Sequence, residues 1–149
     1  MRLTLSTDYA LRTLIYLGAK GGSSTIQEIA ENFDVSKSHL MKVVNKLGRQ
    51  GYIHTLRGKG GGIALGCQPA QIRIAAVVRE TEEDLAVMGC LAETGFCRIE
   101  QCCALRRALQ DATRAFLEVL DNYTLADLLQ PRARLIHSLG LVPEPRVRT

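Results

Sequence analysis

The sequence has no long apolar run and no segment that resembles a secretion signal. None of its hydrophobic stretches approaches the roughly 18 residues that a membrane-spanning helix needs, so we expect no span. The opening residues, MRLTLSTDYALR, carry acidic and hydroxyl side chains where a signal peptide has its apolar core. No internal repeat is visible, and 46% hydrophobic with 23% charged residues is typical of a globular chain. We therefore expect a cytoplasmic, globular protein.

Acidic residues are missing between Asp34 and Glu80. Residues 1–66 carry nine basic and four acidic side chains, whereas the remaining residues carry ten and eleven. A local basic field on a chain of net charge +4 favours a polyanionic partner, because each phosphate that is neutralised releases counterions. A solvated basic face is the alternative. The basic residues of the acid-free stretch are Lys37, Lys42, Lys46, Arg49, Arg57, Lys59, Arg73 and Arg79.

Three short helices are predicted in the first fifty residues. The first has Thr7 as its N-cap candidate, runs to about Leu17 and places Asp8 in its first turn, near the positive end of the helix dipole. The second opens on the capping box TIQE at residues 25–28. The third begins at Ser36 and ends at Gly51. Its apolar residues recur at helical spacing, at Leu40, Val43, Val44 and Leu47.

A basic hairpin is predicted after the third helix. Residues 52–56 and 63–65 suit two strands, and the tip between them reads RGKGGG. Helix, tight turn, helix and a basic hairpin is the order of a winged helix-turn-helix. We therefore predict a mainly α protein with a winged helix-turn-helix DNA-binding domain over residues 1–70.

The third helix is the candidate for the recognition helix, whose N-terminal residues would read base edges in the major groove. The hairpin tip would enter the minor groove or hold phosphates, and its glycines allow a close approach of the backbone. The candidate DNA-binding residues are Ser36, Lys37, Ser38 and His39 for base edges, Lys42 and Lys46 for phosphates, and Arg57 and Lys59 at the tip. His39 and His54 are also possible metal ligands, although lone histidines are more often ordinary surface or core residues.

The second half, residues 71–130, is predicted to hold a helix at 72–83, a cysteine loop at 88–103 and a long helix at 104–120. The long helix has one apolar stripe, formed by Leu105, Ala108, Leu109, Ala112, Phe116, Val119 and Leu120. In a monomer this stripe would leave apolar surface exposed, so we predict a homodimer that buries it, with packing inside the chain as the alternative. Residues 131–149 contain prolines and scattered arginines and are predicted to be a disordered tail.

Four of the five cysteines fall within fourteen residues, which favours metal or redox chemistry over structural disulfides. Cys90, Cys97 and Cys103 are separated by gaps longer than those of zinc knuckles, and they suit a loop around a larger object such as an iron–sulfur cluster. Cys102 is either a bystander or a substitute for Cys103, and Cys67 is expected to be a buried small hydrophobe. From these residues alone, an iron–sulfur cluster, a zinc ion and a bare thiol switch all remain open.

Over about residues 1–130 the sequence resembles the winged-helix iron–sulfur transcription repressors. The resemblance is carried by MRLTLSTDYALRTLIYL, RGKGGGIALG, IRIAAVVRETE, the three cysteines followed by ALRRAL, and FLEVLDNYTLADLL. The first and last of these segments are similar to the nitric-oxide-sensing branch of the family. The resemblance implies a homodimeric repressor that is not an enzyme, and that releases double-stranded operator DNA when nitric oxide attacks its cluster.

The resemblance also implies a set of metal ligands. It assigns Cys90, Cys97 and Cys103, and prefers Cys103 to Cys102 because Cys103 immediately precedes ALRRAL. It implies Asp8 of the other subunit as the fourth ligand, supported by Arg12. A [4Fe-4S] cluster is favoured and [2Fe-2S] is the alternative. The gap between the first two cysteines is slightly longer than the family resemblance leads us to expect.

Two rival functions remain at this point. A regulator of iron–sulfur or redox status would use a histidine three residues after the last cysteine, where this chain has Arg106. An iron–sulfur electron carrier or a thiol enzyme would not need the basic first half, and no paired base lies near the cysteines in the sequence.

Overall fold

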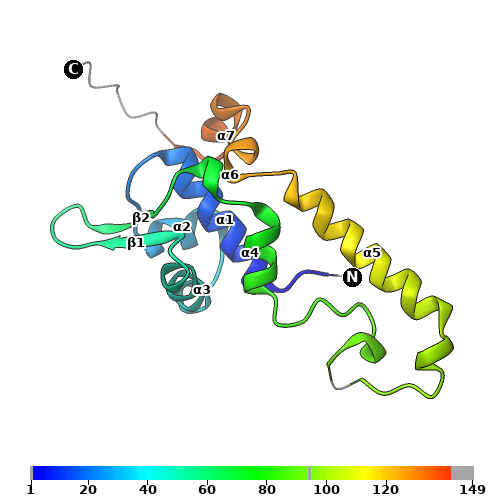
Figure 1. Ribbon diagram of the computed structural model, residues 1–149. Helices are drawn as coiled ribbons and strands as arrows, with labels where there is room; N and C mark the ends of the chain where they lie inside the picture. Colours follow the sequence, from blue (N-terminus) through cyan, green and yellow to red (C-terminus); the bar gives the residue numbers. More distant parts are fainter. Residues whose placement is uncertain (1, 94, 142–149) are drawn as a thin grey trace.

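The structure is a computed structural model that describes residues 2–93 and 95–141. It consists of a helical lobe with a two-stranded hairpin at one side and a long helix that projects from the other (Figure 1). This arrangement confirms the predicted fold class, which is mainly α with a winged helix-turn-helix. The first three helices are α1 (Leu5–Lys20), α2 (Ile26–Phe33) and α3 (Lys37–Arg49).

Local capping explains where the first three helices begin. The side chains of Thr25 and Ser36 accept hydrogen bonds from backbone N–H groups three residues later, at 3.1 and 3.3 Å, as predicted. The first helix begins earlier than predicted, because Thr4 and not Thr7 caps it. The Thr7 hydroxyl is instead buried and lies 2.8 Å from that of Thr81.

The hairpin consists of β1 (Ile53–Leu56) and β2 (Gly62–Leu65), which pair antiparallel. Ser24 extends the pairing, because it exchanges two backbone hydrogen bonds of 2.9 and 2.8 Å with Ile63. Gly62 makes this approach possible: its φ is 153°, and a Cβ there would lie 2.4 Å from the Ser24 carbonyl oxygen. The base of the wing is thereby joined to the loop before α2.

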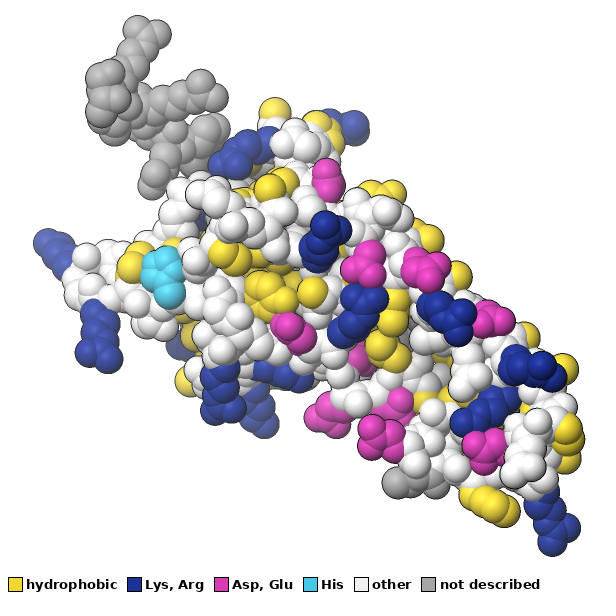
Figure 2. All heavy atoms as spheres, in the orientation of Figure 1, with side chains coloured by type: hydrophobic (Ala, Val, Ile, Leu, Met, Phe, Trp, Pro, Cys, Tyr) yellow, Lys and Arg dark blue, Asp and Glu magenta, His cyan; other side chains and the backbone are white. Residues whose placement is uncertain are grey.

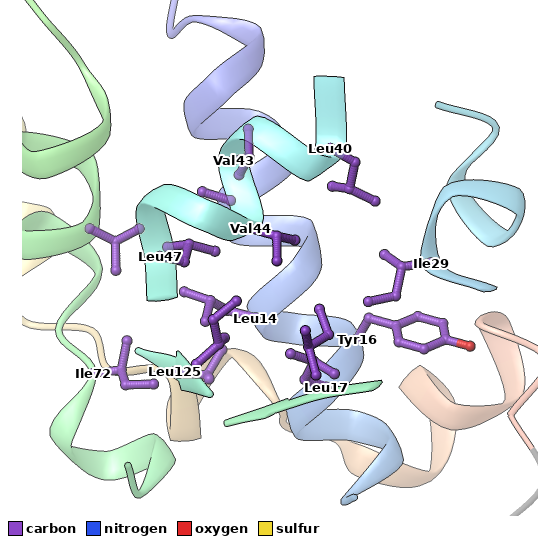
Figure 3. Close-up of a cluster of buried hydrophobic side chains, with 14 of the residues drawn as sticks. Leu14, Tyr16, Leu17, Ile29, Leu40, Val43, Val44, Leu47, Ile72 and Leu125 are labelled. Atoms are coloured by element: carbon purple, nitrogen blue, oxygen red, sulfur yellow. The ribbon is translucent and has the colours of Figure 1, made fainter. Parts of the chain in front are cut away.

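The hydrophobic core lies between α1, α2 and α3 and the segments that cover them (Figure 3). All four residues of the predicted apolar stripe of α3 are buried, which confirms the helical spacing read from the sequence. The side chains of Leu14 and Leu17 point from α1 toward α3 and the hairpin, and Ile29 reaches the core from α2. Burial of such aliphatic side chains stabilises the lobe by about 1.5–3 kcal/mol each.

The second half of the chain covers the lobe and then leaves it. Helix α4 (Ile74–Thr81) packs against α1, and α5 (Ala104–Asp121) packs against α4. An ion pair of 2.8 Å between Arg79 and Asp121 joins α4 to the end of α5. The elements in order are η1 (Pro69–Gln71), α4 (Ile74–Thr81), η2 (Gly89–Leu91), η3 (Glu100–Cys102), α5 (Ala104–Asp121), α6 (Leu125–Leu128) and α7 (Arg132–Ser138).

The prediction of a disordered tail from residue 131 is wrong for the segment that forms α7. Leu135 and Leu139 pack against the core, and the guanidinium of Arg132 donates to the carbonyl oxygen of Gly18 at 3.1 Å. These contacts compensate for the entropy that ordering the segment costs. Residues 142–149 lie outside the described part of the chain. Among the described helices, none has the length and apolarity that crossing a membrane requires.

Candidate functional site

The predicted DNA readers and the predicted cysteine ligands lie at opposite ends of the molecule (Figure 1), and Asp8 and Arg12 lie on α1. The wing and α3 form one end, and the cysteine loop with the start of α5 forms the other. Lys and Arg side chains gather on the wing and α3, whereas over the rest of the same face Lys and Arg side chains are interspersed with Asp and Glu (Figure 2). Basic side chains without neighbouring carboxylates are therefore characteristic of the end that carries the predicted DNA readers.

The exposed residues of α3 form the centre of the basic surface. Lys37, Ser38 and Lys42 are exposed on the helix surface. Ser36 lies before them as the N-cap, and its hydroxyl oxygen is 3.0 Å from that of Ser38. The exposed N-terminus of a helix suits an anionic partner, because its first N–H groups and the helix dipole are directed outward.

Two predicted DNA readers on α3 already have partners within the chain. The imidazole of His39 packs against the ring of Tyr9 in α1, with a distance of 4.9 Å between ring centroids. The ammonium group of Lys46 donates to the carbonyl oxygen of Thr81 at 3.3 Å. His39 is therefore held against α1, while Lys46 keeps further N–H donors for a phosphate.

The wing tip carries Arg57 and Lys59 in full exposure, at the end of β1 and in the turn. A groove of about 560 Å³ separates the wing from α3. It is lined by Asn45 and Arg49 from α3 and by His54 from β1. These three side chains are not among the DNA-binding residues expected from the sequence. Helical spacing could have indicated two of them, because Asn45 and Arg49 follow the exposed Met41 at intervals of four residues.

Asp8 and Arg12 lie on consecutive turns of α1, and Nε of Arg12 donates to the carboxylate of Asp8 at 2.8 Å. The same guanidinium lies over the ring of Phe33 in α2, 5.6 Å from its centroid. Together with the Tyr9 contact to His39, these interactions connect the N-terminal half of α1 to both helices of the helix-turn-helix. A change in the position of Asp8 would therefore act on α3, the predicted recognition helix.

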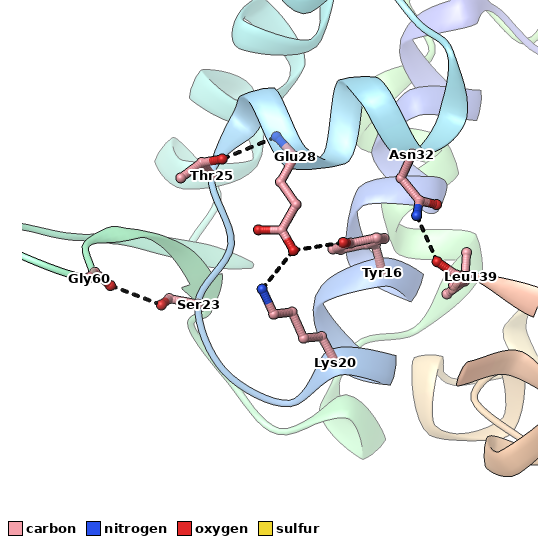
Figure 4. Close-up of polar contacts among 8 residues, drawn as sticks. All are labelled: Tyr16, Lys20, Ser23, Thr25, Glu28, Asn32, Gly60 and Leu139. Atoms are coloured by element: carbon pink, nitrogen blue, oxygen red, sulfur yellow. Dashed lines mark hydrogen bonds and ion pairs between the residues drawn. The ribbon is translucent and has the colours of Figure 1, made fainter. Parts of the chain in front are cut away.

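A second polar network joins the C-terminal half of α1 to α2 (Figure 4). The carboxylate of Glu28 accepts hydrogen bonds from the Tyr16 hydroxyl at 2.8 Å and from Lys20 at 2.7 Å. Burial alone would raise the pKa of Glu28, but the hydrogen bonds from Lys20 and Tyr16 outweigh it and lower that pKa below its ordinary value. The network ties α2 firmly to α1 at neutral pH.

The cysteine loop carries the three predicted metal ligands on short turns. Cys90 lies in η2, Cys97 precedes η3, and Cys103 is the N-cap of α5. All three thiols are free and partly exposed. Cys102 is exposed, and its Sγ donates to the carbonyl oxygen of Ile99 at 3.4 Å. Burial raises the pKa of the Cys67 thiol, which disfavours its thiolate form.

The donor set fits an iron–sulfur cluster in its chemistry but is not gathered in this structure. Three free thiols on one loop are the soft ligands that such a cluster takes. Within residues 2–93 and 95–141, however, no group of three His, Cys, Asp or Glu side chains is close enough to hold a metal ion. Asp8 is carried by α1 and not by the cysteine loop, so within one chain the predicted fourth ligand is not next to the other three.

The model of the Rrf2 family, described as an iron-dependent transcriptional regulator, matches residues 3–131. Two curated relatives are named HTH-type transcriptional regulator NsrR. The relative from Geobacillus kaustophilus is 52% identical, and the match covers 91% of this chain and 94% of the relative. The relative from Bacillus subtilis is 46% identical, and the match covers 95% of this chain and 99% of the relative. Among solved structures, CymR, the global cysteine regulator of B. subtilis, has a TM-score of 0.71 at 28% identity, covering 86% of this chain and 95% of that one. T. potens IscR has the same fold, with a TM-score of 0.70 at 23% identity over 87% of each chain.

Proposed function

The chain belongs to the Rrf2 family of transcriptional regulators, and we propose that it is a nitric-oxide-sensitive repressor that binds operator DNA as a homodimer. Its relatives are named as regulators of transcription and not as enzymes. The observation that carries the proposal is the similarity to regulators named NsrR at 44–52% identity over most of the chain.

The DNA-binding part of the proposal rests on α3 and the wing. The exposed Lys37 and Ser38 would read base edges in the major groove, and Lys42 would neutralise a phosphate beside it. Arg57 and Lys59 would contact the minor groove or the phosphates next to it. The groove between α3 and β1 would take the intervening phosphates, with Arg49 as its cation. Double-stranded DNA is therefore the partner of this surface.

The dimer rests on α5. The structure describes all 18 residues of this helix, and none of them is buried. On its apolar stripe, Leu105 is 57% exposed and Val119 is 58% exposed. An amphipathic helix of this length is stable only where its apolar face is covered. A second copy of α5 would cover it, and the two recognition helices would then address half-sites about one DNA turn apart.

An iron–sulfur cluster would be held by Cys90, Cys97 and Cys103, with Asp8 of the other subunit as its fourth ligand. The favoured cluster is [4Fe-4S], and [2Fe-2S] is the alternative. When bound, the cluster supplies the iron that reacts with nitric oxide. The other steps depend on residues of α1. Asp8 would hold α1 in place, and Arg12 would orient Asp8 through the 2.8 Å hydrogen bond. A shift of α1 would then move His39 on the recognition helix, because the ring of Tyr9 packs against it.

Operator affinity with and without nitric oxide tests this function. The chain is purified without oxygen, its iron and sulfide are counted, and an operator is selected from random duplexes by the iron-loaded protein. We expect nitric oxide to weaken operator binding by about 5–150-fold, the usual range of coupling between two sites. Unchanged affinity after complete reaction with nitric oxide would show that the chain does not sense this signal.

A second candidate function is favoured by the description of the family as iron-dependent. In that case the chain reports iron or cluster supply, and removal of iron by a chelator releases DNA while nitric oxide has no separate effect. Arg106 disfavours the assembly-regulator form of this function, because it stands where those regulators are expected to use a histidine ligand. The two stimuli, applied separately to the same operator complex, distinguish the two functions.

A further inference from the structure

Arg106 lies where the cysteine loop joins α5, and it contacts three parts of that loop. Its Nη1 donates to the carbonyl oxygen of Cys90 at 3.1 Å and also forms an ion pair with Glu100. Its backbone N–H donates to Sγ of Cys103 at 3.3 Å. These contacts join the first predicted ligand to the last, although the two cysteines lie at opposite ends of the loop.

Arg106 is central to the polar contacts between the loop and the helix. Among the described residues, every side-chain hydrogen bond and ion pair between residues 88–103 and α5 involves Arg106. Apolar contact adds to these through η2, where Leu91 is partly buried, whereas Phe96 is 85% exposed and Ile99 is 56% exposed. The side chain of Arg106 itself is only 24% exposed, so its contacts are partly shielded from water.

The chemistry of the guanidinium limits what Arg106 can do. It keeps its proton and has no lone pair to offer, so it cannot replace the histidine ligand of related regulators. Its Nη1 instead donates to the carbonyl oxygen of Cys90 and pairs with the carboxylate of Glu100, so that its charge lies between two parts of the ligand loop. Three metal-bound thiolates and Glu100 are negative, and a fixed cation among them lowers their mutual repulsion.

We propose that Arg106 is a positioning residue that holds the ligand loop closed against α5 and thereby sets how long the loop retains its iron. The inference rests on the proposed function, because it takes Cys90, Cys97 and Cys103 as the iron ligands. It adds a role for a residue that binds neither metal nor DNA.

The first test compares Arg106→Ala with Arg107→Ala. Arg107 is the next residue of α5, is exposed, and has no side-chain hydrogen bond or ion pair among the described residues, so the control removes the same charge without opening the loop. Iron loss to a chelator is followed by the decay of visible absorption under anaerobic conditions. We expect Arg106→Ala to lose iron about 10–100-fold faster than wild type, as is usual when a partner of a metal ligand is removed. Equal rates for the two variants would overturn the proposal.

A second variant separates geometry from charge. Arg106→Lys keeps the positive charge, but its shorter side chain ends in a freely rotating ammonium group instead of the two N–H donors that are fixed in one plane at Nη1. We expect its rate of iron loss to lie closer to that of Arg106→Ala than to wild type. If the lysine variant instead matches wild type, charge alone is sufficient and the positioning role is wrong.

Hydrogen exchange of the iron-free protein tests the loop without the metal. We expect the amides of residues 88–103 to exchange at least several-fold faster in Arg106→Ala than in Arg107→Ala, with α1–α4 unchanged. Identical exchange would overturn the proposal even if iron loss were faster. If wild-type protein contains no iron, the proposed function is wrong, and so is the claim that Arg106 sets how long iron is retained. The exchange measurement then still decides whether Arg106 holds the loop against α5.

Discussion

The ring of Tyr9 packs against the imidazole of His39, with 4.9 Å between the ring centroids and an angle of 57° between the ring planes. Tyr9 follows Asp8 in α1, and His39 lies in the first turns of α3, so this contact links the predicted metal-ligating end of one helix to the DNA-reading end of another. Aromatic contacts of this kind contribute about 0.5–1.5 kcal/mol beyond area burial.

Replacing Tyr9 by leucine should therefore weaken the coupling between iron and DNA. The variant keeps an apolar side chain but loses the ring contact, and we expect the ratio of operator affinities with and without iron to fall about 2–10-fold. Fluorescence anisotropy of a labelled operator measures both affinities. Tyr123→Leu is the control, because Tyr123 is 47% exposed near the end of α5. A full iron effect in the Tyr9 variant would contradict this route.

Lys42→Ala should weaken DNA binding without changing sequence preference. Lys42 is exposed on α3 and is proposed to neutralise one phosphate, so the slope of log affinity against log salt should fall by about 0.9. Binding is measured over a range of salt concentrations, with operator and unrelated duplexes. Arg114→Ala removes a cation that is 66% exposed on α5 and should leave the slope unchanged. A loss confined to the operator would make Lys42 a base reader.

Cys97→Ser should abolish iron loading and leave the fold intact. The residue is partly exposed on the cysteine loop, outside the hydrophobic core, so the helical signal in circular dichroism should not change. Iron and sulfide per chain, counted after anaerobic purification, should fall close to zero. Cys67→Ser is the matched control and should keep its iron, since Cys67 packs beside the core near the wing. Iron retained in the Cys97 variant would mean that the ligand assignment is wrong.

A charge placed on the apolar face of α5 should separate the dimer. Val119→Glu puts a carboxylate on the stripe of this helix, and we expect a shift from dimer to monomer in sedimentation velocity, with weaker operator binding as a result. Gln110→Glu adds the same charge to the polar face and should remain dimeric. A dimeric Val119 variant would show that the subunits associate through another surface.

The helices of the first half could be predicted because their signals are local. The hydroxyl caps at Thr25 and Ser36 and the apolar spacing of α3 each depend on residues within one or two turns, and the structure contains all of them. The start of α1 was misplaced because Thr4 and Thr7 are both plausible caps. What distinguishes them is the hydrogen bond between the hydroxyls of Thr7 and the distant Thr81, which no local pattern reveals.

The same limit applies to the site. The contacts of Lys46 with Thr81 and of Arg106 with Cys90 join residues 35 and 16 positions apart, so their partners could not be read from spacing. The order of α7 was missed for a different reason. The prolines of the tail suggested disorder, whereas Leu135 and Leu139, four residues apart, already marked a helical face that packs on the core.

Glu28 should make the lobe less stable in acid. Burial of Glu28 opposes its charge, but the hydrogen bonds from Lys20 and Tyr16 prevail, so its pKa is lower in the folded chain than in the unfolded one. A lowered carboxyl pKa contributes stability that is fully present above the unfolded value, near pH 4.3, and is lost as the pH falls through the folded value.

Glu28→Gln removes the charge at every pH. The free energy of unfolding, measured by urea titration, should therefore be lower in the variant than in wild type at pH 7, by less than about 1 kcal/mol because the side chain is 37% exposed. The difference should shrink as the pH falls below 4.3, since wild type then loses the same interaction. Glu31→Gln is the control, because it makes the same change on α2 at an exposed carboxylate whose only partner among the described side chains is Gln27. The difference in unfolding free energy between this variant and wild type should not depend on pH. A gap between wild type and Glu28→Gln that stays constant down to pH 3 would mean that the charge of Glu28 does not hold α1 and α2 together.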